Sequence, residues 1–287
     1  MTTASTITEE NTSKVIEAHG MNVHYHDIGE GEPLIMLHSY GPGTTAWITF
    51  HKNFPELSKH FRCIAMDLPN YTKSGPVVYE ETQHIFQAKT ALALMDALGI
   101  EKAHILGNSQ GGQSALTFAY LFPDRIKKLV WGGGHIGTSG GYPNEYLLAN
   151  KQEEGIRASR EAGANPTREN FRRYLELHIV DQALITDELV DYLLHMHTAR
   201  PDITEARSKS YSVPYDHSRD IMNITAPTLI IWGRNDRTCL FEIGINALNL
   251  IPNSRLIVLR DTGHWSPFEK PEEYNSHVLS FLKGDWA

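Results

Sequence analysis

Short apolar runs alternate with longer amphipathic stretches along most of the chain. Continuous apolar runs occur at residues 33–37, 63–66, 103–106, 128–131, 228–232 and 256–259. Runs of this kind are typical of strands that are buried on both faces, as in a parallel sheet. Two further strands are expected at residues 15–18 and 21–25, around a turn at Gly20. The pattern predicts an α/β protein with a mostly parallel, eight-stranded sheet and helices on both faces.

Helical periodicity fills a long connection between two of these runs. Apolar residues recur three or four positions apart, at Ile85, Ala88, Leu92, Met95 and Leu98. That spacing places them on one face of a helix, which would pack against the sheet. Gly99 is a suitable residue for the end of this helix.

The stretch from residue 135 to residue 222 interrupts the alternation. It is rich in charged residues and predicts amphipathic helices at 167–177, 186–198 and 203–210, without clear strands. Because it directly follows the strand at 128–131, we expect an inserted helical cap over the site. The α/β core would then comprise residues 1–134 and 223–287. The alternative is a helical subdomain with no role in the site.

The most specific motif is the sequence Gly107-Asn-Ser-Gln-Gly111. It matches G-x-S-x-G, the strand–turn–helix in which a nucleophilic serine stands on a strained turn. A predicted strand runs into it and a helix-compatible stretch, residues 113–121, follows. We therefore predict that Ser109 is a nucleophile, the alternative being a glycine-rich turn that merely contains a serine.

A serine nucleophile needs a base, and the base needs an orienting acid. His264 follows the last predicted strand, and Asp236 follows the strand at 228–232, which gives the chain order Ser, Asp, His. Asp261 is a weaker candidate for the acid, because it lies too close to His264 in sequence. We predict a triad of Ser109, Asp236 and His264.

The loop Leu37-His-Ser-Tyr-Gly-Pro-Gly43 follows an early buried strand. Loops in this place supply one backbone N–H to an oxyanion hole, and the residue after the nucleophile supplies the other. We predict the amides of Tyr40 and Gln110 for these two positions. His38 is expected to brace the loop through hydrogen bonds rather than to carry protons.

Composition and charge narrow the possible partners. The net charge is −8 and there is no dense basic run, so neither nucleic acid nor an anionic membrane is an expected partner. No apolar stretch reaches the length of a membrane span, and the N-terminus does not resemble a signal peptide. Cys63 and Cys239 could form one disulfide, but we interpret them as reduced thiols of a cytoplasmic protein.

These motifs resemble those of the α/β-hydrolase fold over nearly the whole chain. Within that superfamily the chain resembles the meta-cleavage product hydrolases, which cut a carbon–carbon bond in 2-hydroxy-6-oxo-dienoates from aromatic ring degradation. The matching stretches are residues 41–47, 107–112, 232–237 and 263–265. The resemblance implies an enzyme without metal or organic cofactor that acts on a small molecule as a homodimer or larger oligomer. It also implies that Asn108 and Trp265 line the substrate pocket, the alternatives being a buried turn amide and a packing indole. We further predict that Ser39 and Gly41, in the loop after the early strand, bind substrate.

The chain departs from that family in the loop and in the cap. Ser39 and Tyr40 follow the loop histidine where glycine is usual, and Thr49 replaces an asparagine. The family's cap arginine, which binds the substrate carboxylate, is replaced by Leu193 at the expected place, although Arg200 and Arg207 are near in sequence. A buried carboxylate without a charged partner is costly, so the substrate of this chain could lack it.

Four functions remain open at this point. The first is cleavage of a carbon–carbon bond in a meta-cleavage-type diketone, and the second is a carboxylesterase or lactonase on a small apolar ester. Two hypotheses are more remote: a cofactor-free oxygenase or lyase, which would use the His–Asp pair without acyl transfer, and a ligand receptor, against which an intact triad argues. An epoxide hydrolase or dehalogenase is not expected, since those enzymes use a carboxylate where this chain has Ser109.

Overall fold

A computed structural model describes residues 6–136, 153–211 and 215–284. The sheet has eight strands in the order β1-β2-β4-β3-β5-β6-β7-β8. The pairs β1–β2 and β2–β4 are antiparallel, and every other pair is parallel. The predicted fold class, a mostly parallel eight-stranded α/β sheet, is confirmed.

The strands are β1 (Ser13–Ala18), β2 (Met21–Ile28), β3 (Glu32–Leu37), β4 (Phe61–Met66), β5 (Ala103–Asn108), β6 (Ile126–Gly132), β7 (Thr228–Gly233) and β8 (Ser254–Leu259). The helices of the sheet region are α1 (Glu9–Thr12), α2 (Ala46–Phe50), α3 (Phe54–Leu57), α4 (Gln83–Ala97), α5 (Gln110–Leu121), α11 (Glu242–Leu250), α12 (Ser266–Glu269) and α13 (Pro271–Lys283). The helices between β6 and β7 are α7 (Glu153–Ala164), α8 (Arg168–His178), α9 (Asp187–Thr198) and α10 (Pro201–Lys209). Short 3-10 turns are η1 (Pro123–Arg125), η2 (Gln182–Leu184) and η3 (Ile221–Asn223).

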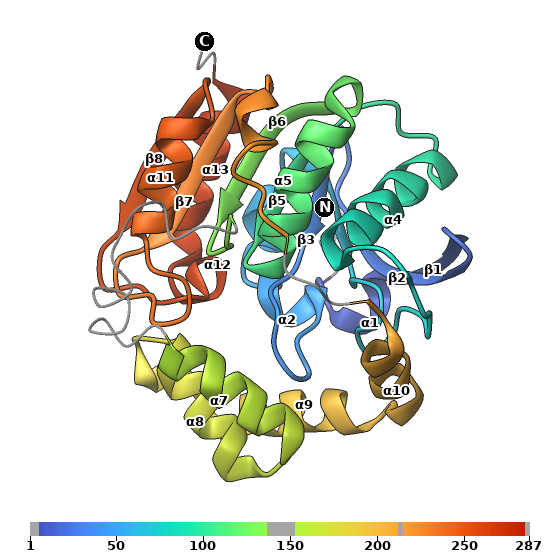
Figure 1. The fold of residues 1–287 in the computed structure, drawn as a ribbon, viewed down its shortest axis with the longest axis vertical. Coiled ribbons are helices and arrows are strands. Elements are labelled where there is room, and N and C mark those ends of the chain that lie inside the picture. Colours follow the sequence, from blue (N-terminus) through green and yellow to red (C-terminus); the bar gives the residue numbers. More distant parts are fainter. Residues whose placement is uncertain (1–5, 137–152, 212–214, 285–287) are drawn as a thin grey trace.

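Helices cover both faces of the sheet (Figure 1). Each face has its own apolar core. One core joins side chains of α4, α5 and α11 to the sheet, and the other joins those of α2, α3 and α13. Every residue of β5 and of β7 is buried. Burial on both faces explains why these two strands appear in the sequence as unbroken runs rather than as alternating patterns.

The helices α7, α8, α9 and α10 gather outside the sheet, at the bottom of Figure 1. Side chains of α7, α8 and α9 form a third apolar cluster, which also includes Ile48, Trp265 and Phe268 of the sheet region. We refer to α7–α10 as the cap. Residues 137–152 and 212–214 lie outside the described residues, so the boundaries 135–222 stay a prediction.

Within the described residues, no helix is long and apolar enough to cross a membrane. Cys63 and Cys239 are both buried free thiols. No cluster of three or more potential metal ligands occurs in the part of the chain that the structure covers.

Candidate active site

The carboxyl ends of β5, β7 and β8 meet at one edge of the sheet. Parallel pairing aligns Gly107 with Trp131, Trp131 with Ile230, and Ile230 with Leu256. The loops that leave these strands carry Ser109, Asp236 and His264. Residues far apart in the chain therefore converge where the sites of open α/β sheets are assembled.

Ser109 occupies a strained turn between β5 and α5. Its φ of 56° and ψ of −119° are unfavourable for a residue with a side chain. Its N–H donates to the Gly132 carbonyl at 2.8 Å, which fixes the turn against β6. A Cβ atom at Gly107 would lie 2.3 Å from the Gly111 carbonyl oxygen, and one at Gly111 would lie 2.1 Å from that of Leu37. Only glycine fits at these two positions, as the motif requires.

The structure brings the three predicted triad residues together. His264 Nε2 lies 2.9 Å from Ser109 Oγ, and His264 Nδ1 lies 2.7 Å from Asp236 Oδ2. The other oxygen of Asp236 accepts hydrogen bonds from the backbone N–H groups of Thr238 and Cys239, at 2.7 and 2.9 Å. Both oxygens of this buried carboxylate are thus satisfied, which fixes it as a partner for Nδ1–H of the imidazole.

The competing carboxylate, Asp261, faces away from this cluster. Its side chain is 65% exposed and pairs with Arg260 at 3.0 Å. An exposed ion pair of this kind contributes little energy and holds no other group in place. Asp236 is therefore the carboxylate that contacts His264.

The amides predicted for the oxyanion hole lie on two segments that are hydrogen-bonded to each other beside Ser109. Gln110 is the first residue of α5, so its N–H has no partner within the helix. The Tyr40 loop is tied to the same turn, because the Gly111 N–H donates to the His38 carbonyl at 3.0 Å. The side-chain oxygen of Gln110 accepts a hydrogen bond from the Tyr71 hydroxyl at 2.8 Å. Both N–H groups lie on segments that are held close to Ser109.

His38 stabilises this loop through two hydrogen bonds of its ring. Its Nδ1 donates to the Ser39 carbonyl at 2.8 Å, and its Nε2 accepts from the Leu68 N–H at 2.9 Å. Burial lowers the pKa of His38 to about 4, so the ring is neutral at neutral pH. A neutral ring with both nitrogens occupied fits the structural role that the sequence predicted.

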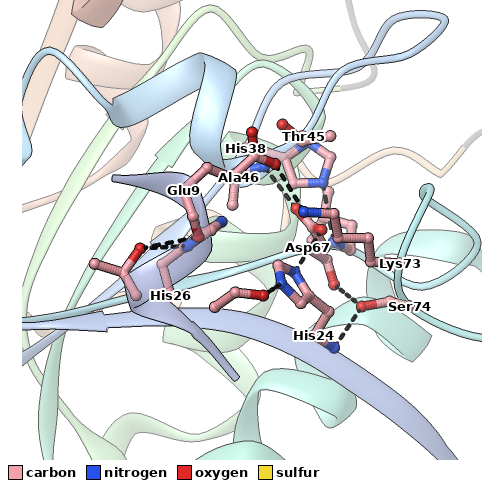
Figure 2. A network of polar contacts seen from close by, with 12 residues as sticks. Glu9, His24, His26, His38, Thr45, Ala46, Asp67, Lys73 and Ser74 are labelled. Carbon is pink, nitrogen blue, oxygen red and sulfur yellow. Dashed lines mark hydrogen bonds and ion pairs between the residues drawn. The ribbon is translucent and has the colours of Figure 1, made fainter. Parts of the chain in front are cut away.

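A buried aspartate that the sequence analysis did not single out supports the same loop. Asp67, directly after β4, accepts hydrogen bonds from His24 Nδ1 at 2.8 Å and from the Ala46 N–H at 2.7 Å (Figure 2). Burial raises the pKa of Asp67, but the interactions with His24, His38 and the Ala46 N–H together outweigh burial and lower the pKa to about 2. The ionised carboxylate accepts a hydrogen bond from the first residue of α2. This helix follows residues 37–43, which we call the oxyanion loop after its predicted role. The only signal of Asp67 in the sequence is its place after a buried strand.

Four residues were predicted to bind substrate, and all border the triad or the loop. Asn108 Nδ2 donates to Ser39 Oγ at 2.7 Å and to the His264 carbonyl at 3.2 Å. Trp265 is buried beside the cap, with its ring 6.0 Å from that of Tyr174. A Cβ atom at Gly41 would lie 2.1 Å from the Tyr174 hydroxyl, so the cap touches the loop there. Substrate binding by Ser39, Gly41, Asn108 and Trp265 stays a prediction.

The cap places a leucine where the resemblance implies an arginine. Leu193 is fully buried, and its carbonyl oxygen would lie 1.9 Å from a Cβ atom at Gly43. The guanidinium of Arg207, from α10, lies over the ring of Tyr71 at 4.0 Å. Arg207 thus contacts the tyrosine whose hydroxyl binds Gln110, and the cap does bring a cation near the oxyanion loop.

Comparison with known proteins identifies the family of this chain. The chain matches the family described as the alpha/beta hydrolase fold over residues 32–271. A 2-hydroxy-6-oxononadienedioate/2-hydroxy-6-oxononatrienedioate hydrolase from Pseudomonas putida is 37% identical over 92% of this chain and 92% of that protein. A 2-hydroxy-6-oxo-6-phenylhexa-2,4-dienoate hydrolase from Comamonas testosteroni is 35% identical over 96% of this chain and 98% of its own.

A solved structure gives the same result. A mutant of the meta-cleavage product hydrolase CumD superimposes with a TM-score of 0.82 and 31% identity, over 96% of this chain and 99% of that one. By sequence and by fold, the chain belongs to the α/β-hydrolase family and, within it, to the meta-cleavage product hydrolases.

Proposed function

We propose that this protein hydrolyses the carbon–carbon bond next to the 6-oxo group of a 2-hydroxy-6-oxo-dienoate, with Ser109, His264 and Asp236 as catalytic residues. One observation carries the proposal: the imidazole of His264 contacts the Ser109 hydroxyl and the Asp236 carboxylate at the same time. In that arrangement Nδ1–H faces the carboxylate, which leaves Nε2 free to take a proton.

The chemistry follows from this tautomer. The substrate first ketonises, moving the 2-hydroxyl proton to C5. His264 then takes the Ser109 proton as Oγ bonds to the C6 carbonyl carbon, whose oxygen is held by the Tyr40 and Gln110 amides. The C5–C6 bond breaks, its electron pair delocalises into the 2-oxo group, and His264 returns the proton to that fragment. Water then hydrolyses the acyl-serine, so one water is consumed, and no step needs a metal or an organic cofactor.

The nature of the relatives supports carbon–carbon cleavage over other hydrolyses. The two curated hydrolases named above act, by their names, on 2-hydroxy-6-oxo acids. Both match nearly the whole chain, including the cap that would enclose the substrate. A carbon leaving group departs only if its electron pair is delocalised, and the 2-oxo group of such a substrate provides that delocalisation.

The carboxylate of such a substrate needs a charged partner in place of the missing arginine. A small pocket of about 20 Å³ between the oxyanion loop and the cap is lined by Gly43, Tyr71, Arg200 and Arg207, among others. Arg207 donates from Nη2 to the Asn70 carbonyl, and its Nε has no partner among the described residues. We assign Arg207 to the substrate carboxylate, since Arg200 is paired with Asp202 at 2.6 Å.

One observation favours a second candidate function, a carboxylesterase on a small apolar ester. Leu193 presents no charge at the place where the resemblance implies an arginine, and it belongs to the apolar cluster under the cap. A small apolar ester has no carboxylate, so it needs no cation in the binding site. The same triad would cleave it by acyl transfer.

The test offers the purified protein 2-hydroxy-6-oxo-6-phenylhexa-2,4-dienoate and a short-chain aryl ester in parallel. We expect kcat/KM for the dienoate to exceed that for the ester by at least about 100-fold. S109A should lower both by about 10³-fold or more. Turnover of the ester alone would contradict carbon–carbon bond hydrolysis and support the carboxylesterase function. Dienoate cleavage that survives in S109A would remove Ser109 from the mechanism.

A further inference from the structure

The catalytic histidine is held by the cap as well as by the triad. The backbone N–H of His264 donates to the carbonyl of His178, the last residue of α8, at 2.8 Å. The imidazole rings of the two residues pack edge to face, with centroids 5.3 Å apart. The position of the base therefore depends on a segment that is separate from the sheet.

A buried carboxylate joins the same two segments a second time. Glu269, at the end of α12, accepts a hydrogen bond from the Gly263 N–H through Oε1 at 2.7 Å. Its Oε2 accepts one from the Val180 N–H of the cap, also at 2.7 Å. The Glu269 side chain thus links Gly263, which precedes His264, to Val180, which follows α8.

The surroundings of Glu269 are unusual for a charged group. Its side chain is buried, and no cation pairs with it among the described residues; Lys52 instead lies 3.6 Å from the Phe268 ring centroid. Burial raises the pKa of Glu269, and the nearby charge of Asp236 adds to that effect, while backbone hydrogen bonds oppose it. Burying a carboxylate costs free energy. The two oxygens of Glu269 offset this cost by accepting hydrogen bonds from the Gly263 and Val180 N–H groups.

The His264 loop packs closely against the cap at Gly263. A Cβ atom at Gly263 would lie 2.4 Å from the His178 carbonyl oxygen and 2.9 Å from Glu269 Oε1. His178 itself is fully hydrogen-bonded, because Nδ1 donates to the Tyr174 carbonyl at 2.7 Å and Nε2 accepts from the Thr238 hydroxyl at 3.0 Å. The His264 loop, the end of α8 and the Glu269 carboxylate are therefore in direct contact with one another.

We propose that Glu269 is a positioning residue for hydrolysis: it ties the cap to the His264 loop and so keeps the imidazole aligned between Asp236 and Ser109. This inference rests on the proposed triad chemistry. It predicts that the cap acts directly on the base, so that a displaced cap lowers the rate of the chemical step and not only substrate binding. Misplacement of a catalytic group by about 1 Å can cost about 100-fold in rate.

The test replaces the carboxylate with an amide, E269Q. Glutamine accepts one of the two backbone N–H groups, and its own NH₂ then opposes the other. We expect kcat to fall by about 10- to 100-fold while KM changes less than about threefold, because the substrate contacts are untouched. E273Q on the neighbouring helix, where the side chain is exposed, is the matched control and should keep wild-type kinetics.

A second readout separates positioning from a merely structural role. The downfield proton NMR signal of His264 Nδ1–H reports its hydrogen bond to Asp236 without any turnover. In folded E269Q we expect this signal to shift or broaden, and in E273Q to stay in place. An E269Q protein with a lower Tm but unchanged kcat and an unshifted signal would overturn the proposal. If the wild type cleaves neither substrate, the proposed function is wrong. The NMR signal of His264 Nδ1–H in E269Q and E273Q then still tests whether Glu269 positions the imidazole.

Discussion

The side-chain amide of Asn108 lies 2.7 Å from the hydroxyl of Ser39. The two residues come from different strand ends, one directly before the nucleophile and one in the oxyanion loop. The same amide nitrogen also donates to the His264 carbonyl at 3.2 Å. Asn108 therefore links three loops of the site through a single group.

This link predicts coupling between the two side chains. Asn108→Ala removes both bonds and leaves the buried Ser39 hydroxyl unpaired, so we expect kcat/KM to fall about tenfold or more. Ser39→Ala should cost less, and the double variant should resemble Asn108→Ala. A double-mutant cycle on kcat/KM should give a coupling energy of about 1 kcal/mol. Additive effects would mean that the two residues act independently.

Asp236→Asn tests the tautomer of the base. The amide oxygen can keep the hydrogen bonds from Thr238 and Cys239. The amide nitrogen then donates to His264 Nδ1, which moves the ring proton to Nε2 and prevents it from accepting the Ser109 proton. We expect kcat to fall by about 10³- to 10⁴-fold with a folded protein. Steady-state kinetics beside a circular dichroism spectrum checks this, and a loss below tenfold would contradict the assigned role.

Arg207→Met tests the partner of the substrate carboxylate. The variant keeps an unbranched apolar side chain over Tyr71 and removes the charge. We expect kcat/KM for the dienoate to fall about 100-fold or more, and that for a neutral aryl ester to change less than about threefold. Arg200→Met, which alters the same pocket but removes an arginine paired with Asp202, is the control. Equal losses on both substrates would indicate that Arg207 only supports the fold.

Buried neutral histidines predict acid sensitivity of the fold. Burial lowers the pKa of His26, His38 and His217 to about 4, from an ordinary value of 6.5. Between these values the unfolded chain binds protons that the folded chain excludes. Stability is therefore retained above pH 6.5 and lost as the pH falls toward 4, by up to about 1.4 kcal/mol per pH unit for each histidine.

Urea unfolding at several pH values between 7.5 and 4.5 measures this slope. His217→Gln should flatten the pH dependence, because it removes one of the groups that protonate only on unfolding. His195→Gln, at an exposed position of α9, should leave it unchanged. A free energy of unfolding that is constant down to pH 5 would rule out the expected contribution of the buried rings.

The sequence was sufficient for the sheet and for the grouping of Ser109, Asp236 and His264, which the structure brings into hydrogen-bond contact; their catalytic roles stay a prediction. Buried parallel strands such as β5 and β7 carry unbroken apolar runs, and the order of Ser109, Asp236 and His264 follows directly from the strands they leave. Three of the four described cap helices, α8, α9 and α10, were predicted to within two residues at each end, since their amphipathic periodicity is local, whereas α7 was not predicted. The short helices α1, α2 and α3 have too few turns to produce such a pattern.

The supporting residues could not be predicted, because their partners are set by tertiary contacts. Asp67 is recognisable only once β2 and α2 place His24 and Ala46 against it. Glu269 gains its role from two backbone N–H groups, one of which belongs to the cap. Backbone donors have no identity in a sequence, so neither carboxylate could be distinguished from a surface acid.

The measurement that tests the central claim most directly follows the oxygen of water into the products. The purified protein is incubated with 2-hydroxy-6-oxo-6-phenylhexa-2,4-dienoate in H₂¹⁸O, and both fragments are analysed by mass spectrometry after brief turnover. We predict benzoate with one ¹⁸O atom in its carboxylate and a hydroxydienoate fragment in which the enzyme has placed none. Recovery of the intact dienoate, under conditions in which an aryl ester is hydrolysed, would contradict carbon–carbon bond hydrolysis by this protein.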